Sequence, residues 1–216
     1  MNECKFLTGI IIACLLGIII SSINISVQKH NEINELKTQI NSLNTQLNEL
    51  RKVQNKKLQI KDSLITEINN YINHIAPDNN LSGELLLNAC LEYNIDIIFV
   101  LAQGQLESGF GTKGVATKTN SVWNVMSYDG RSSNYIISKG HGYNDPNESI
   151  TPYLKLLKNR YLTNGKTEKD LMNNFMSDSG HRYASSTQYE YHLKSIYNKI
   201  LNQTNINELM VEYLQN

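Results

Sequence analysis

The sequence has little cysteine and no net charge, and both absences exclude classes of protein. The three cysteines among 216 residues are Cys4, Cys14 and Cys90, two in an apolar leader and one in a helix-like run. This arrangement indicates neither a disulfide framework nor a thiolate metal site. The 20 basic side chains balance 20 acidic ones, without a Lys/Arg block or zinc-finger spacing. We therefore expect no nucleic-acid partner.

A charge-free apolar run extends from Phe6 to Ile25. About 20 helical residues cross a hydrocarbon core of about 30 Å, so the run predicts a transmembrane helix at 6–25 after a short tail at 1–5. It is longer than the apolar part of most cleaved signal peptides, and a lipoprotein box at Cys14 would be followed by polar residues, whereas this one is followed by LLGIII. We expect a single-pass membrane protein whose C-terminal part faces the periplasm or cell wall.

Residues 26–77 are polar with apolar residues at heptad spacing, and glycine and proline are absent from Val27 to Ala76. The apolar positions are Ile33, Leu36, Ile40, Leu43, Leu47, Leu50, Leu64, Ile68 and Tyr71. This spacing predicts a coiled-coil stalk and a homo-oligomer, with a phase break at Gln54, Lys57 and Lys61. The alternatives are a lone solvated helix and a segment packed against the rest of the protein.

The remaining residues, 78–216, suffice for one compact domain. Helical patterns occupy 81–94, 96–107, 145–157 and 187–201, with a short helix beginning at Thr167 and capping residues at Asp96 and Asp145. Between the second and third patterns, residues 112–144 contain only short β-like pieces at 122–126 and 134–138. We expect a mainly α-helical domain with a small β or irregular lobe.

Glu107 is the first candidate for chemistry. It lies in the last turn of an apolar helix, beside Leu106 and near Phe110. The negative end of the helix dipole and poor hydration both favour a protonated carboxyl. A general acid needs this property, although most glutamates at helix ends are simply solvated.

The residues around Glu107 resemble a known motif. The segment 102–111, AQGQLESGFG, is similar to the AQ-x-x-LESGWG segment of bacterial and phage β-N-acetylglucosaminidases, family 73 of the glycoside hydrolases. Three further segments resemble that family in order: TNSVWNV at 119–125 (family T-N-N-L-F-G-I), the helix from Tyr143 to Leu157 (Y-x-x-x-x-E-S-I-x-x-Y-x-x-L-L), and Tyr183-Ala184 followed by Tyr189. The resemblance covers nearly the whole C-terminal domain and implies a lysozyme-like fold.

The resemblance implies catalytic roles for three residues. Glu107 would be the general acid. Asp129 would be the second carboxylate, unless it is an ordinary residue of an Asp-Gly turn or the acetamido group of the substrate takes its place. Tyr183 would position the sugar or the attacking water, unless it is a core aromatic residue. Sugar-binding candidates are Phe110, Asn120, Trp123, Tyr128 and Tyr143. For Trp123, which lies near Val122 and Val125, the alternative is a core position.

Other polar residues have structural explanations. The spacing of Glu148 from Asp145 predicts a capping box. His141 and His181 lack the spacing of metal ligands, and Ser108 lacks a His/Asp partner. We expect no metal and no cofactor.

The sequence therefore predicts a membrane-anchored peptidoglycan hydrolase that cuts the β-1,4 bond after N-acetylglucosamine. Two alternatives remain: a muramidase or lytic transglycosylase of the same fold, and a non-catalytic scaffold that binds cell-wall glycan.

Overall fold

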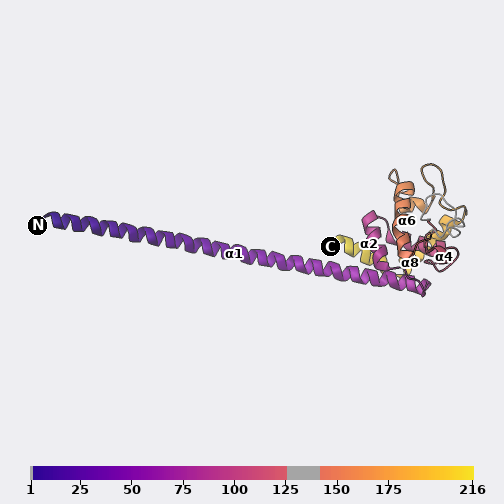
Figure 1. Ribbon diagram of the computed structural model, residues 1–216, viewed down its shortest axis with the longest axis horizontal. Coiled ribbons are helices and arrows are strands. Elements are labelled where there is room, and N and C mark those ends of the chain that lie inside the picture. Colours follow the sequence, from indigo (N-terminus) through magenta and orange to yellow (C-terminus); the bar gives the residue numbers. More distant parts are fainter. Residues whose placement is uncertain (1, 126–141) are drawn as a thin grey trace. The chain divides into compact units, whose positions relative to one another are not determined.

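The computed structural model describes the backbone of residues 2–125 and 142–216, and the side chains of residues 15–125 and 142–216. Contacts divide the chain into two units, Met1–Lys56 and Lys57–Asn216. Helix α1, Asn2–Ile75, contributes to both units (Figure 1). The predicted mainly α-helical fold is confirmed for the described residues.

The first unit consists of the N-terminal part of α1. Its apolar side chains from Leu15 to Val27, and those at the heptad positions from Ile33 to Leu50, are all exposed. Among the described side chains, no helix combines the length and apolarity that a membrane crossing requires. The predicted span at 6–25 lies partly outside these side chains, and the coiled coil stays a prediction.

The last turns of α1 belong to the second unit. Leu64, Ile68 and Tyr71, which the heptad pattern had placed on a seam between chains, are buried in this chain's own core. Contacts to α2, Gly83–Tyr93, are close: the Asn69 Oδ1 atom accepts a hydrogen bond from the Gly83 N–H at 2.8 Å. A Cβ atom at Gly83 would lie 2.6 Å from that oxygen, so a larger residue would displace the Asn69 side chain and its hydrogen bond. The seam prediction therefore needs correction at these three positions.

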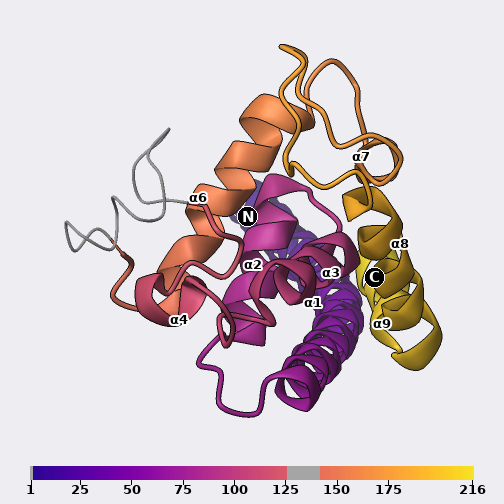
Figure 2. The same ribbon diagram turned by 90° about the vertical axis from the view of Figure 1, so that its right-hand side faces the viewer.

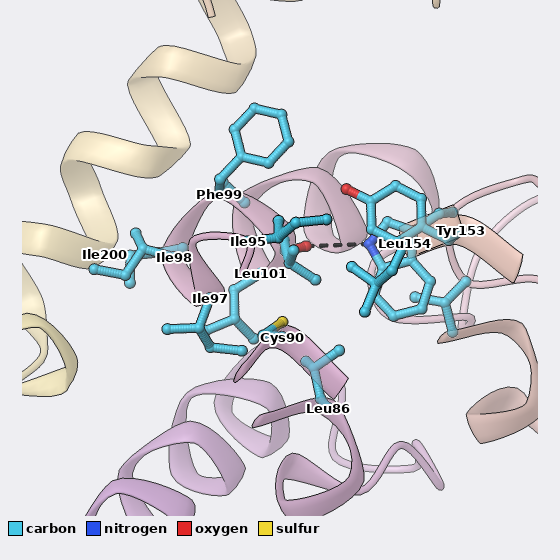
Figure 3. Packing of buried hydrophobic residues seen from close by; sticks show 14 of the residues in the cluster. Leu86, Cys90, Ile95, Ile97, Ile98, Phe99, Leu101, Tyr153, Leu154 and Ile200 are labelled. Carbon is cyan, nitrogen blue, oxygen red and sulfur yellow. Dashed lines mark hydrogen bonds between the residues drawn. The ribbon is translucent and has the colours of Figure 1, made fainter. Parts of the chain in front are cut away.

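Helix α3, Ile97–Ser108, is the central element of the domain. Figure 2 shows α2, α6 and α8 around it. Its N-cap is Asp96, as predicted, whose carboxylate accepts the Ile98 N–H at 2.8 Å. Every residue from Ile97 to Gly104 is buried, so α3 is apolar on all sides and its position is fixed by its neighbours (Figure 3).

The described part of the predicted lobe, residues 112–125 and 142–144, contains the short helix α4, Ala116–Thr119. Within residues 2–125 and 142–216 there is no strand, only an isolated bridge between Met176 and Arg182. The expected β-like piece at 122–126 is wrong over 122–125, because Asn124 has a φ of 54° that interrupts extended backbone. The other expected piece, 134–138, lies outside the described residues.

The helices after the lobe largely follow the predictions. A 3₁₀ turn η1, Pro146–Ser149, leads into α6, Ile150–Leu156, which ends in a π turn η2, Leu157–Tyr161. The short helix α7, Glu168–Leu171, has a capping box between Thr167 and Asp170. Helix α8, Tyr189–Gln203, packs along α3, and α9, Ile206–Gln215, was not predicted from the sequence.

Candidate active site

Glu107 lies in the last turn of α3, where the motif residues that follow it end the helix. Gly109 has a φ of 55° and its N–H bonds to the Gln105 carbonyl at 3.0 Å. The Ser108 hydroxyl accepts the Gly111 N–H at 2.7 Å and donates to the Val122 carbonyl at 2.6 Å. Ser108 therefore joins the helix end to the following loop, which is a structural role.

Two side chains donate hydrogen bonds to the Glu107 carboxyl group. The Tyr189 hydroxyl, from the start of α8, donates to Oε1 at 2.5 Å. The Asn124 amide donates to Oε2 at 2.8 Å and to the Glu107 carbonyl at 3.2 Å. Each carboxyl oxygen is thus held by a different segment, and the side chain has a fixed direction.

Burial raises the pKa of Glu107 above its ordinary value, while the hydrogen bonds from Tyr189 and Asn124 oppose this rise without cancelling it. More of the carboxyl is therefore protonated at neutral pH than in an exposed glutamate. The side chain is only half-buried, so this proton is accessible to a ligand. A half-buried, oriented carboxyl with a raised pKa is suited to general acid catalysis.

Tyr183 lies in an aromatic cluster close to Glu107. Its ring stacks on Phe175, with centroids 4.6 Å apart, and lies 5.8 Å from the ring of Tyr189. Its hydroxyl donates to the Trp123 carbonyl at 2.9 Å. Burial raises the pKa of Tyr183, and the charge of Glu107 raises it further, so the phenol stays neutral. The geometry places Tyr183 next to Tyr189, which bonds to Glu107, and the catalytic role of Tyr183 stays a prediction.

Two of the proposed sugar-binding aromatics are core residues. Trp123 and Phe110 are each 1% exposed. The Trp123 ring stacks on Tyr153 at a centroid distance of 4.6 Å, and its Nε1–H donates to the Val100 carbonyl at 3.1 Å. Phe110 packs edge-on against Tyr71 of α1. We therefore reassign both from sugar contact to packing.

Asn120 and Tyr143 connect the two ends of the lobe. The Asn120 amide donates to the Tyr143 carbonyl at 2.9 Å, and the Tyr143 N–H bonds to the Thr119 carbonyl at 2.8 Å. The Tyr143 hydroxyl donates to the Val125 carbonyl at 3.3 Å. These bonds support the loop that carries Asn124, whereas sugar binding by the two residues stays a prediction.

The structure describes only some of the remaining candidates. Tyr128, Asp129 and His141 lie outside the described residues. Asp145 caps η1 as expected, but the Glu148 carboxylate accepts the N–H of Asn144 at 3.1 Å, one residue earlier than a capping box requires. Within residues 15–125 and 142–216, no cluster of three or more His, Cys, Asp or Glu side chains is placed to hold a metal ion.

Sequence reasoning missed Asn124 as a site residue. The resembling family motif has glycine at this position, and the φ of 54° explains why: asparagine is among the few other residues that adopt this conformation readily. Tyr189 was noted only as part of a motif. The replacement of a motif glycine by a hydrogen-bonding residue was the available signal for Asn124.

A comparison with protein-family models decides the family. Residues 83–202, more than half of the chain, match the glucosaminidase model, described as mannosyl-glycoprotein endo-β-N-acetylglucosaminidase. The chain belongs to this family. The glucosaminidase is therefore a glycoside hydrolase, and membership supports activity on peptidoglycan. Among curated proteins, none matches the chain. The matched range covers Glu107, Asn124 and Tyr189 of the glucosaminidase and begins after α1.

Proposed function

We propose that this glucosaminidase hydrolyses the β-1,4 bond after N-acetylglucosamine in peptidoglycan, with Glu107 as the general acid. The supporting observation is the environment of the Glu107 carboxyl group. Burial raises its pKa, and Tyr189 and Asn124 each donate a hydrogen bond to one of its two oxygens. As the glycosidic bond breaks, the protonated carboxyl donates its proton to the leaving oxygen, and positive charge develops on the sugar.

The first experiment compares wall clearing by the full chain and by Glu107→Gln. The variant keeps the shape of the side chain and loses the transferable proton, so we expect clearing to fall by about a thousandfold or more. Glu92→Gln is the matched control, because Glu92 is an exposed glutamate in the last turn of α2. Equal clearing by Glu107→Gln and the wild type would remove Glu107 from the mechanism.

The bond that is cut distinguishes the proposal from the related enzymes. A glucosaminidase leaves N-acetylglucosamine at the new reducing end, a muramidase leaves N-acetylmuramic acid, and a lytic transglycosylase leaves an anhydro-muramic terminus. Mass analysis of released fragments identifies the new end, and anhydro termini would overturn the bond assignment. Wall binding without any release of fragments by the wild type would favour the non-catalytic scaffold.

The second catalytic group is proposed to be Asp129 or the acetamido group of the substrate. The described side chains that bond to the Glu107 carboxyl are a phenol and an amide, so neither supplies the negative charge that stabilises the developing cation. If Asp129 has this role, Asp129→Asn loses activity on every substrate. If the acetamido group has it, Asp129→Asn stays active and substrates without an N-acetyl group are not cleaved.

We further propose that the N-terminal part of α1 tethers the enzyme to a membrane, with the catalytic domain facing the periplasm or cell wall. Its exposed side chains from Leu15 to Ile20 are apolar around the helix, which water does not favour. Replacing Leu16 and Ile20 by lysine should move the protein from the membrane fraction to the soluble fraction after alkaline extraction. An unchanged distribution would contradict a tether in this segment.

The heptad positions from Ile33 to Leu50 support a proposed coiled coil with a second copy of the chain. Their side chains are exposed in the single chain, although isoleucine and leucine at this spacing form a continuous apolar stripe.

A further inference from the structure

Behind Glu107, three hydrogen bonds connect it to the centre of the core. The Tyr153 hydroxyl of α6 donates to Gln103 Oε1. The Gln103 Nε2 atom donates to the Tyr189 hydroxyl oxygen at 3.0 Å, and the Tyr189 hydroxyl donates to Glu107 Oε1 at 2.5 Å. Gln103 precedes Glu107 by four residues, so both side chains lie on one face of α3.

The inner residues of this series of hydrogen bonds are buried and excluded from water. Gln103 and Tyr153 are 0% exposed, and Tyr189 is 7% exposed. A buried amide that lacks partners costs free energy, which makes glutamine an expensive residue in the middle of an apolar helix. Both ends of the Gln103 amide are bonded, which gives the side chain a single direction.

The direction of the amide determines where the Tyr189 proton points. A tyrosine hydroxyl has only one proton. Because Gln103 donates to the Tyr189 oxygen, that proton is available to Glu107 Oε1. This oxygen then accepts a hydrogen bond of fixed direction, and the Asn124 amide holds Oε2 from the other side, so the plane of the carboxyl group is set.

We propose that Gln103 is a positioning residue, held by Tyr153, that directs the Tyr189 hydroxyl toward Glu107 Oε1 and thereby fixes the direction of the acid side chain. This inference rests on the proposed role of Glu107 as the general acid. Gln103 acts through Tyr189 and does not contact the substrate.

The ionisable groups that face Glu107 do not titrate in the same pH range. Among the described residues, those that face it are the phenols of Tyr153, Tyr183 and Tyr189. Burial raises the pKa of all three, so they stay neutral over the range in which Glu107 ionises. Donation by Tyr189 favours the carboxylate, and its loss raises the pKa of Glu107 further.

The test measures kcat and KM against pH on a soluble peptidoglycan fragment, using the full chain and Gln103→Met. Methionine fills a similar volume but neither donates nor accepts strongly. We expect kcat to fall about tenfold, as for the loss of one hydrogen bond of ordinary net strength, with KM unchanged. We also expect the alkaline limb of the pH–rate profile, where activity falls as Glu107 loses its proton, to move to higher pH. Gln105→Met, in the same helix but bonded to Tyr71, is the matched control and should keep the wild-type limb.

A double-mutant cycle separates positioning from packing. Tyr189→Phe should move the alkaline limb in the same direction, and the Gln103→Met/Tyr189→Phe double variant should move it no further, because Gln103 acts only through Tyr189. Tyr153→Phe removes one oxygen atom and with it the hydrogen bond to Gln103 Oε1. This variant should shift the alkaline limb in the same direction by a smaller amount. It also provides the readout if Gln103→Met does not fold.

Two results overturn the proposal in different ways. If Glu107→Gln is inactive while the Gln103 and Tyr153 variants keep the wild-type limb and lose only thermal stability, the positioning role is wrong and the general acid stands. If Glu107→Gln is fully active, the general acid itself is wrong, and the positioning role is lost with it.

Discussion

At the residue scale, the acid function proposed for Glu107 depends on opposing effects on the pKa of its carboxyl group. Burial raises the pKa of Glu107, and the hydrogen bonds from Tyr189 and Asn124 limit the rise. A fully desolvated carboxyl without donors would hold its proton too strongly to transfer it, whereas a solvated one would lack the proton at neutral pH. Glu107 has both the burial that raises the pKa and the donors that oppose the rise.

Asn124 offers a direct test of this balance. Asn124→Gly removes the donor to Oε2, and glycine adopts a φ of 54° without strain. The pKa of Glu107 should therefore rise, and the alkaline limb of the pH–activity profile should move to higher pH. Asn124→Ala should move the limb equally and unfold more readily than the glycine variant, by about 1 kcal/mol, because alanine disfavours this φ. Rate profiles and thermal melts measure the two effects. A wild-type limb in both variants would contradict the role of Asn124.

Glu107 should also affect stability in a pH-dependent way. Its folded pKa is raised above the unfolded value, so the folded state binds the proton more tightly and the wild type loses stability as pH rises between those two values. Glu107→Gln does not titrate. The melting temperature of Glu107→Gln relative to the wild type should therefore increase with pH and level off above the folded pKa. A difference that is constant from pH 4 to pH 8 would contradict a raised pKa.

At the element scale, the catalytic domain is larger than its family motif indicates. The family match begins at residue 83, but Leu64, Ile68 and Ile72 of α1 are each 0% exposed in the same core as α3. The Tyr71 hydroxyl also donates to Gln105, in the helix that carries Glu107. The end of α1 is thus a structural part of the domain.

Two matched substitutions in α1 test this assignment. Ile68→Ala should lower the free energy of unfolding by about 3 kcal/mol, because it opens a cavity in the core. Ile40→Ala, at an exposed heptad position of the first unit, should leave the catalytic domain's melting temperature unchanged. Equal melting curves for the two variants, recorded by circular dichroism, would show that the end of α1 does not support the domain.

The sequence predicted local features well, but it did not predict which segments pack against one another. The caps at Asp96 and Thr167 and the helix end after Glu107 follow from short-range chemistry that a sequence displays. A heptad pattern, in contrast, shows that Ile68 is buried but not against what, and here the partner is the same chain. Trp123 illustrates the same limit, because an aromatic residue in a motif is compatible with a sugar platform and with the core. Its burial depends on Tyr153, 30 residues away in the chain.

At the scale of the whole molecule, the two parts of α1 differ in the exposure of their apolar side chains. The positions up to Leu50 are available to another copy of the chain, while those from Leu64 onward are used within the domain. The phase break at Gln54, Lys57 and Lys61 lies at the boundary between the two units. The change in register therefore coincides with the change from exposed apolar side chains, up to Leu50, to buried ones, from Leu64 onward.

Oligomerisation tests the N-terminal part of α1. Leu36→Glu combined with Leu43→Glu places charges on the apolar stripe, so we expect the wild type to sediment as an oligomer and the double variant as a monomer. The rate of cleavage of a soluble fragment per catalytic domain should not change, because neither residue belongs to the second unit. A wild type that is monomeric at every concentration would refute the coiled coil.

The central claim is that one protonated carboxyl breaks the glycan. Its most direct test is the pH dependence of kcat/KM for the full chain on a soluble peptidoglycan fragment, with Glu107→Gln measured alongside. We predict that the rate of the wild type falls as pH rises through a pKa above that of an ordinary glutamate, and that the variant has no measurable rate at any pH. A wild-type rate that does not decline on the alkaline side, or a variant that retains the wild-type rate, would contradict the account.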